Sequence, residues 1–343
     1  MRNASRYRVR FRNSNVRYVY SLAARFGLFV VLAFSFIRPR QRQDVKVVDI
    51  TRLEAGLPAT FFSRSCPSTA TIVTAYYNLK TYSKHSEEYF KKWNARFFSL
   101  SDNMVIFSDW DSSKRIIASR RNSRGCTLLV RQKLSDTEMF DLTDWDYQHR
   151  LDPEGKIHSV ELYIIWDQKP LWLEAVAKLN PFQSTHFFWA DSGQFRDDAF
   201  LRAHISKGEK WVTSTDFIPP CKSLFMSIEN FKPHELQKDR SEMAQPLSSE
   251  VVRLGGGNFG GDSCSVVKFA QRFRSEIRRY LKKGLFVGKD QPIYGSICTS
   301  WRDMCFLVDA AKVINIRDKW FAAQPVLHGV AQVLAVPEYT LPS

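Results

Sequence analysis

The first 42 residues contain no acidic residue and no lysine, although they include ten arginines. Subtracting these ten charges from the net charge of +15 leaves +5 on the remaining 301 residues, an ordinary surface charge. A strongly basic chain often has nucleic acid or an anionic membrane as its partner. Because the excess charge lies in the tail, we expect no nucleic acid among the partners of the folded part. An RNA-binding tail is the alternative, and it predicts steeply salt-dependent binding that deletion of residues 1–42 abolishes.

The amino-terminal region also lacks a clean apolar run of the roughly 20 residues that span a bilayer. Residues 26–37 carry no charge, and the run reaches about 20 residues from Tyr18 if Arg25 extends towards the lipid head groups. Arginines are more numerous before the run than after it, which favours a cytosolic amino end. No small-residue cleavage site follows Ile37, so the run is predicted to be a signal anchor. An Arg- and Ser-rich mitochondrial presequence is the alternative.

These features predict a single-pass type II membrane protein that faces the lumen of the Golgi or endoplasmic reticulum. The expected parts are a basic cytosolic tail (1–25), the core of the anchor helix (26–37), a stem (38–67) and a folded domain (68–343). The composition of the whole chain is that of a globular protein, with 44% hydrophobic and 14% aromatic residues.

Cysteine pairs with the C-x-x-C spacing of zinc or redox sites are missing. The six cysteines are Cys66, Cys126, Cys221, Cys264, Cys298 and Cys305. Their even number fits disulfides in an oxidising lumen, with 15 possible connectivities. Six buried free thiols are an equally weighted alternative.

Strand and helix patterns alternate from residue 69 onwards, which is typical of a mostly parallel sheet with helices on both faces. Strand patterns occupy residues 69–78, 104–109, 126–130 and 186–191, and helical spacing occupies residues 85–100, 112–121, 158–179 and 263–283. Pro170 is expected to kink or split the helix that contains it. Residues 135–157 are predicted to form a long loop. The sequence therefore predicts an α/β domain.

Two classical nucleotide-binding motifs are absent, namely the Walker A motif and the Rossmann G-x-G-x-x-G motif. Instead, five of the nine residues from Leu254 to Asp262 are glycine, directly before a predicted helix. A glycine-rich turn with free N–H groups suits a phosphate, and a plain flexible turn is the alternative. A second turn contains Lys289 and Asp290.

Acids follow two predicted strands, at Asp109 and Asp191. Ligands of α/β sheets bind beyond the carboxyl ends of the strands, where an acid can hold a divalent metal and the metal can hold phosphate oxygens. In the transfer of a sugar from a nucleotide diphosphate, the leaving diphosphate develops negative charge that a metal and cationic groups must stabilise. A second carboxylate often takes the proton of the acceptor. Capping of the next helix is the alternative role of each acid.

Motifs in the same order resemble the HtrL/YibB family over roughly residues 68–310. They are the segments 71–78, 84–86 with Tyr89 and Trp93, 104–109, 158–166, 169–170, 180–182, 189–193 with 195–196, 255–261 and 286–291. The family is regarded as similar to glycosyltransferases of the GT-A fold, in which a D-x-D motif holds the metal. The matching segment here, Ala190-Asp-Ser-Gly193, has a single acid.

The resemblance implies a single GT-A-like domain and a glycosyltransferase of the hexosyltransferase kind, with a nucleotide-sugar donor, a glycan acceptor and a divalent metal, most simply Mn²⁺. We expect Asp191 to bind the metal, and Asp290 to be the catalytic base or a second metal ligand. Donor-binding roles are assigned to Tyr76, Asp109, Lys169, Gly255, Gly256, Gly257, Gly260, Gly261 and Lys289. The alternative to a phosphate-binding role for Lys169 is a surface ion pair with Asp167. His158 is interpreted as a helix cap or a core residue. A non-enzymatic carbohydrate-binding or scaffold protein is the alternative function.

Overall fold

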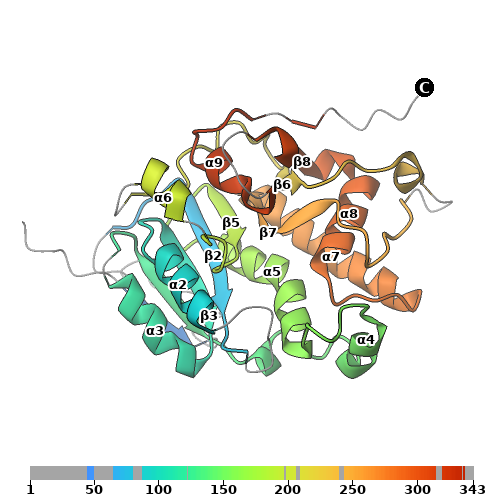
Figure 1. Ribbon diagram of the computed structural model, residues 1–343, viewed down its shortest axis with the longest axis horizontal. Coiled ribbons are helices and arrows are strands. Elements are labelled where there is room, and N and C mark those ends of the chain that lie inside the picture. Colours follow the sequence, from blue (N-terminus) through green and yellow to red (C-terminus); the bar gives the residue numbers. More distant parts are fainter. Residues whose placement is uncertain are drawn as a thin grey trace, which may run out of the picture. The chain divides into compact units, whose positions relative to one another are not determined.

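The computed structural model describes residues 45–49, 65–79, 87–121, 123–196, 198–205, 209–238, 243–313, 319–333 and 335–336 (Figure 1). The predicted tail and signal anchor lie outside these residues, as does most of the predicted stem. Within the described residues, no helix combines the length and the apolar character that crossing a membrane requires.

The centre of the fold is one eight-stranded sheet with the order β1-β4-β3-β2-β5-β7-β6-β8. The strands are β1 (Val45–Asp49), β2 (Ala70–Tyr76), β3 (Asn103–Ser108), β4 (Thr127–Arg131), β5 (His186–Ala190), β6 (Ser223–Ser227), β7 (Leu254–Asp262) and β8 (Cys305–Asp309). All neighbouring strands run parallel except β7, which is antiparallel to both β5 and β6. The predicted mostly parallel sheet is therefore confirmed.

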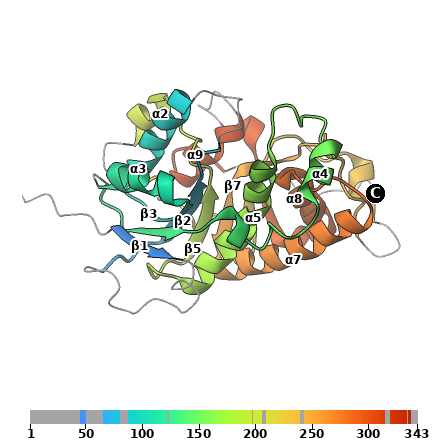
Figure 2. The ribbon, with the colours of Figure 1, turned by 90° about the horizontal axis from the view of Figure 1, so that it is seen from below.

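Helices cover both faces of the sheet, as predicted (Figures 1 and 2). One face carries α5 (Val160–Leu179), α7 (Ser263–Lys282) and α8 (Asp290–Ser300), with α4 (Trp145–Leu151) beside α5. The other face carries α2 (Glu87–Phe98), α3 (Trp110–Arg120), α6 (Asp198–His204) and α9 (Ala323–Leu327). Short 3₁₀ turns occur at η1 (Leu134–Asp136), η2 (Pro233–Leu236), η3 (Arg302–Met304), η4 (Ala310–Lys312) and η5 (Lys319–Phe321).

The strand β5 shows why the sheet has a core on each side. Phe187 and Trp189 belong to the cluster under α5 and α7, whereas Phe188 and Ala190 belong to the cluster under α2. Successive side chains of a strand point to opposite faces, so a strand buried on both faces is apolar throughout. This is why the aromatic run identified in the sequence forms a central strand.

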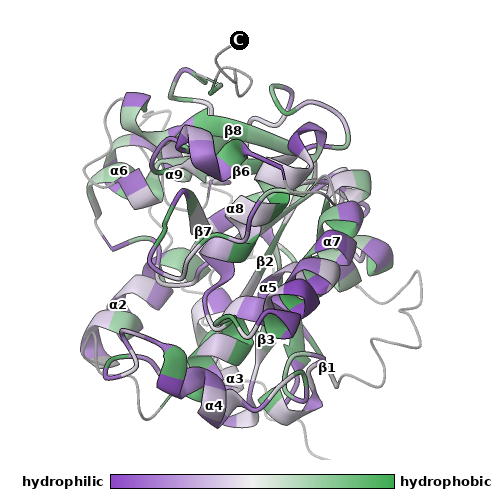
Figure 3. Ribbon diagram, turned by 90° about the vertical axis from the view of Figure 1, so that its right-hand side faces the viewer, coloured by the Kyte–Doolittle hydropathy of each residue, from purple (hydrophilic) through white to green (hydrophobic). Residues whose placement is uncertain are grey.

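The helix α7 follows its sequence signals closely. Asp262 caps its start by accepting a hydrogen bond from the Ser265 N–H at 2.7 Å. Gly284, with φ of +68°, follows its end. Figure 3 shows hydrophilic residues along this helix, and Lys268, Arg272 and Arg278 are among the exposed ones.

Three expectations about local structure are wrong, and of the kink or split expected at Pro170 the split does not occur. Residues 45–49, expected in the stem, form β1 and pair with β4, and three of these five residues are valine, which favours strands. The expected loop 135–157 contains α4, which buries Trp145. Helix α5 continues through Pro170 without splitting, since packing on the core outweighs one lost hydrogen bond. The glycine-rich segment is the strand β7.

All six cysteines form disulfides, which decides between the two alternatives left open by the sequence. The pairs are Cys66–Cys126, Cys221–Cys264 and Cys298–Cys305. The first joins the segment before β2 to the start of β4, and the third joins α8 to β8. Disulfides of this kind persist in oxidising compartments.

Candidate active site

A cavity of about 800 Å³ opens at the edge of the sheet where the parallel strands end. Its walls include the residues after β2, the residues after β5 and the first part of β7. Because β7 is antiparallel to β5, its amino-terminal part lies at this same edge. In open α/β sheets, this edge is where ligands bind. The structure thus brings the predicted acid and two of the predicted glycines into one cavity.

Lys169 of α5 lies at the centre of the charged groups in the cavity wall. Its ammonium is 2.9 Å from Asp290 Oδ2 and 3.3 Å from Asp191 Oδ1, and it donates a hydrogen bond to the Gly256 carbonyl at 3.1 Å. Only 2% of the residue is exposed, so the alternative of a surface pair with Asp167 is wrong. Burial lowers the pKa of Lys169, but the charges of Asp191 and Asp290 outweigh burial and raise it overall.

Asp191 follows the last residue of β5 and is held from two sides. Its Oδ1 accepts a hydrogen bond from Trp189 Nε1 at 2.8 Å, and its backbone N–H donates to the Gly257 carbonyl at 2.9 Å. Its side chain is 43% exposed. No described residue donates a hydrogen bond to its Oδ2, so this oxygen is available to a ligand.

Asp290 is the first residue of α8 and is 4% exposed. Burial raises its pKa, while the Lys169 ammonium acts in the opposite direction. Asp167 is a third carboxyl group that interacts with Asp290 and Lys169, and the sequence did not indicate that it belongs to this cluster. It is fully buried, and neither of its oxygens has a hydrogen-bond partner within the described chain. Burial, followed by the negative charge of Asp290, raises its pKa well above the ordinary value.

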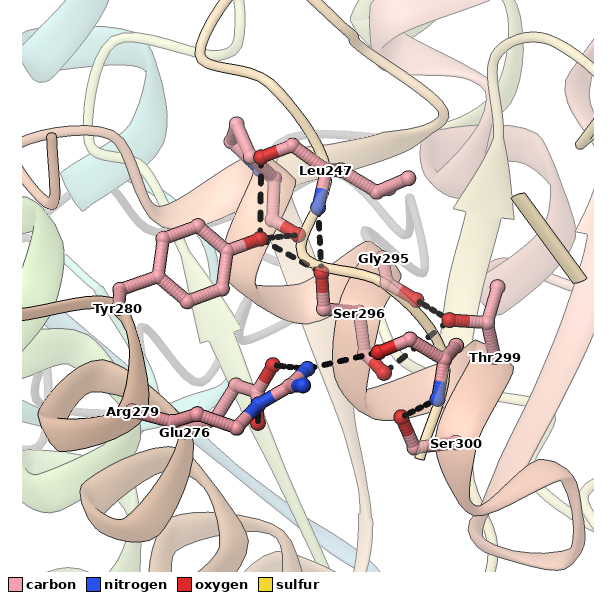
Figure 4. Close-up of polar contacts among 10 residues, drawn as sticks. Leu247, Glu276, Arg279, Tyr280, Gly295, Ser296, Thr299 and Ser300 are labelled. Atoms are coloured by element: carbon pink, nitrogen blue, oxygen red, sulfur yellow. Dashed lines mark hydrogen bonds and ion pairs between the residues drawn. The ribbon is translucent and has the colours of Figure 1, made fainter. Parts of the chain in front are cut away.

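A polar network behind the site fixes α8 and therefore Asp290 (Figure 4). Tyr280 Oη of α7 lies 2.6 Å from Ser296 Oγ of α8 and donates to the Leu247 carbonyl at 3.1 Å. Ser296 Oγ in turn accepts the Leu247 N–H at 3.0 Å. These contacts are fully buried, and buried networks with satisfied partners make an element rigid.

The predicted glycines separate into two groups. Gly256 and Gly257 line the cavity, and a Cβ at these positions would lie 2.8 Å from the Asp290 oxygens and 3.3 Å from Asp191 Oδ2, respectively. Gly255 faces Met226 and Ile228 on the opposite face of the sheet.

The remaining two glycines, Gly260 and Gly261, lie at the other end of β7. A Cβ at Gly260 would lie 2.1 Å from the Phe187 carbonyl oxygen, and one at Gly261 would lie 2.4 Å from Ser265 Oγ. These glycines allow close packing of strands and helix. The prediction of a phosphate-binding turn at residues 255–261 is therefore wrong, because these residues belong to the strand β7.

The other predicted donor-binding residues have different surroundings. Tyr76 lines the cavity, and its hydroxyl accepts a hydrogen bond from Arg115 Nη1 at 3.0 Å. Asp109 is outside the cavity lining and caps α3 by accepting the Ser112 N–H at 2.6 Å. Lys289 lines the cavity, but its ammonium pairs with Glu154 at 2.5 Å.

The adjacent glycines Gly255 and Gly256 provide a matched test of this geometry. Gly256→Ala should lower the free energy of unfolding by about 1–3 kcal/mol, because the new methyl group displaces the Asp290 carboxylate from Lys169. Gly255→Ala should be neutral or slightly stabilising, since its nearest contact would be an ordinary 3.5 Å to Ile228 Cδ1. Urea unfolding of both variants measures the difference, and equal destabilisation would contradict the assigned faces.

The donor groups of the cavity fit a divalent cation that is shared with a ligand. Asp191 offers one accessible carboxylate oxygen, and hard cations are often held by one or two carboxylates together with substrate phosphates. Within the described residues, the only group of three clustered metal-type side chains is Cys221, Asp262 and Cys264, and its two sulfurs form a disulfide. Asp191 Oδ2 is thus an oxygen at this edge of the sheet to which a divalent cation could bind.

Fold and site together define an α/β protein with a charged and aromatic ligand cavity at the carboxyl edge of its parallel strands. The chain belongs to the HtrL/YibB family. The model of this family, described as "Bacterial protein of unknown function (HtrL_YibB)", matches residues 68–328. This confirms the resemblance identified in the sequence. Among curated proteins there is no match.

Two solved structures are similar to part of this chain. Mouse xyloside xylosyltransferase 1 in its apo form is 11% identical, with a TM-score of 0.38, over 71% of this chain and 86% of that chain. Core-mannan synthase A from Aspergillus fumigatus, in a Mn/GDP form, is 10% identical, with a TM-score of 0.39, over 72% of each chain.

Proposed function

We propose that this protein is a glycosyltransferase that uses a nucleotide-sugar donor and a glycan or glycoconjugate acceptor. The observation that carries the proposal is the Lys169 ammonium held between Asp191 and Asp290 in the wall of a cavity at the carboxyl edge of the sheet. The fixed ammonium orients the two carboxylates, and together with a divalent cation held by Asp191 it would stabilise negative charge that develops on a leaving diphosphate, without reorganisation during the reaction.

The cavity also suits the rest of a nucleotide sugar. Its volume of about 800 Å³ lies within the range of small-molecule sites. Tyr76, Tyr77 and Trp166 line it and offer aromatic faces for a base or a sugar ring. The aromatic groups and the charged cluster are thus combined in one cavity, which is what recognition of a nucleotide diphosphate requires.

We further propose that a divalent metal, most simply Mn²⁺, binds at Asp191 Oδ2. The carboxylates of Asp191 and Asp290 lie on either side of the single ammonium of Lys169, and a divalent cation would offset the excess negative charge where the diphosphate binds. When bound, such a metal supplies Lewis-acid stabilisation of phosphate oxygens. Trp189 and Lys169 orient the Asp191 carboxylate for this role.

The cellular location is a second part of the proposal. We infer a type II protein anchored in the membrane by residues 26–37, with the folded domain in the lumen of the Golgi or endoplasmic reticulum. The three disulfides support an oxidising lumen, because such bonds are rare in the cytosol.

Calorimetric titration of residues 42–343 with a panel of nucleoside diphosphates, with Mn²⁺ or with a chelator, tests the donor site. We expect one nucleotide to bind in a metal-dependent way and Asp191→Ala to weaken it roughly 100-fold, since a metal contributes several kcal/mol. Asp141→Ala removes an exposed carboxylate elsewhere and should bind like the wild type. A folded wild-type protein that binds no nucleotide would contradict the proposal and favour a carbohydrate-binding or scaffold protein.

A further inference from the structure

A second polar cluster lies in the cavity wall where the α4 region meets α5. His158 Nδ1 is 2.7 Å from Asp152 Oδ2, and Tyr163 donates its hydroxyl proton to the same oxygen at 2.7 Å. The Asp152 side chain is fully buried, while His158 is in the cavity lining with 6% of its side chain exposed. The structure therefore contains an imidazole that is oriented by a buried carboxylate.

The second ring nitrogen, Nε2 of His158, makes no hydrogen bond to any described residue. With Nδ1–H donating to Asp152, Nε2 carries the lone pair and is free to accept a proton from a ligand. Trp166 packs edge-on against the ring at 5.1 Å and limits its rotation. A fixed tautomer with one accessible basic nitrogen is the arrangement that a catalytic histidine needs.

The surrounding charges favour a base over an anion-binding site. The charged and titratable groups around His158 are Asp152, Glu154, His149, Tyr163 and Lys289. Two of them are carboxylates and only one is an ammonium, so the ring lies in a net negative environment. Such an environment repels a phosphate but not the neutral hydroxyl of an acceptor.

The cluster shares the cavity with the Lys169 site. Lys289 lies 3.8 Å from Asp152 Oδ1 and precedes Asp290 in the chain, so the two polar groups are linked through two consecutive residues. The Asp290 side chain is about as buried as that of His158, with 5% and 6% exposed, but Asp290 is paired with Lys169, whereas His158 Nε2 makes no hydrogen bond to any described residue.

We propose that His158, oriented by Asp152, is the general base that accepts the proton of the acceptor hydroxyl. The inference rests on the proposed glycosyltransferase function and assigns Asp290 the positioning of Lys169. In the step, the acceptor oxygen forms a bond to the anomeric carbon while the bond from that carbon to the diphosphate oxygen breaks. The electron pair of the broken bond leaves with the diphosphate, and the hydroxyl proton moves to Nε2 and later to water.

The test compares His158→Asn with the wild type, once a panel of nucleotide sugars and simple glycosides has identified a transfer reaction. Asparagine can still donate to Asp152 but cannot accept the proton. We expect kcat to fall roughly 10²–10⁴-fold, with nucleoside diphosphate Kd and melting temperature close to wild type. His186→Asn, at the opposite end of β5 from Asp191, should transfer like the wild type.

His158→Ala adds a readout that a purely structural histidine would not change, and it replaces His158→Asn if that variant does not fold. Free imidazole should restore a measurable part of its rate. Wild-type kcat in His158→Asn, or a parallel loss of nucleotide binding and thermal stability without rescue, would overturn the base assignment while the wild type remains active. Absence of transfer by the wild type with every donor would instead overturn the proposed function, and the base assignment with it.

Discussion

Lys169→Met is expected to lower the free energy of unfolding by about 3–5 kcal/mol and to abolish nucleotide binding. The substitution leaves Asp290, which is 4% exposed, without the ammonium 2.9 Å away. Removing one partner of a buried ion pair leaves an uncompensated charge, and this cost exceeds the value of the pair itself. Urea unfolding gives the stability, and calorimetry with the nucleotide panel gives the binding.

Two further variants make this result specific. Lys178→Met removes an ammonium from the same helix, but its side chain is 60% exposed, so a change within about 1 kcal/mol is expected. Lys169→Met combined with Asp290→Asn removes both charges and should recover much of the lost stability without recovering binding. A single Lys169→Met variant as stable as the wild type would show that the pair is not buried as described.

The second large effect concerns the disulfides. Replacing Cys66 and Cys126 together by alanine should lower the free energy of unfolding by about 4 kcal/mol, because this bond closes a loop with a sequence separation of 60. The same replacement of Cys298 and Cys305, with a separation of seven, should cost about 2 kcal/mol. Urea unfolding without reductant measures both, and all four cysteines are replaced by the same residue.

The order of these two effects is the informative outcome. If loss of the Cys298–Cys305 disulfide lowers the free energy of unfolding more, stability depends on packing around α8 and β8 rather than on restriction of the unfolded chain. If neither replacement lowers the free energy of unfolding, the cysteines act as buried apolar side chains, and the disulfides no longer support an oxidising lumen.

The sequence predicted most of the fold because its local signals agree with the final packing. The β-branched residues of β2 and the helical spacing of α7 give the correct element types within about two residues. The strand β7 could not be predicted in this way, because glycine has a low preference for strands. It becomes a strand because β5 and β6 offer hydrogen bonds on both sides, and close packing at Gly260 and Gly261 excludes larger side chains.

The candidate site was predictable only in part. Asp191 was identified from its place after a strand, and Asp290 from its turn. Nothing local indicates that Lys169 contacts both, since Asp290 lies more than 100 residues further along the chain. Asp167 carries no local signal of burial, since charged residues are usually exposed. For Asp109, an Asp placed directly before a predicted helix was itself a capping signal that favoured the structural role.

The antiparallel strand β7 has a consequence for the synthesis of the protein. Lys169 and Asp191 emerge from the ribosome long before Leu254, yet until β7 is made the edge of β5 has no partner on that side. An open apolar edge is a template for pairing with other chains. A product that stops before residue 254, whether from premature termination or an alternative transcript, would therefore retain Lys169 and Asp191 without Asp290, on a sheet prone to self-association.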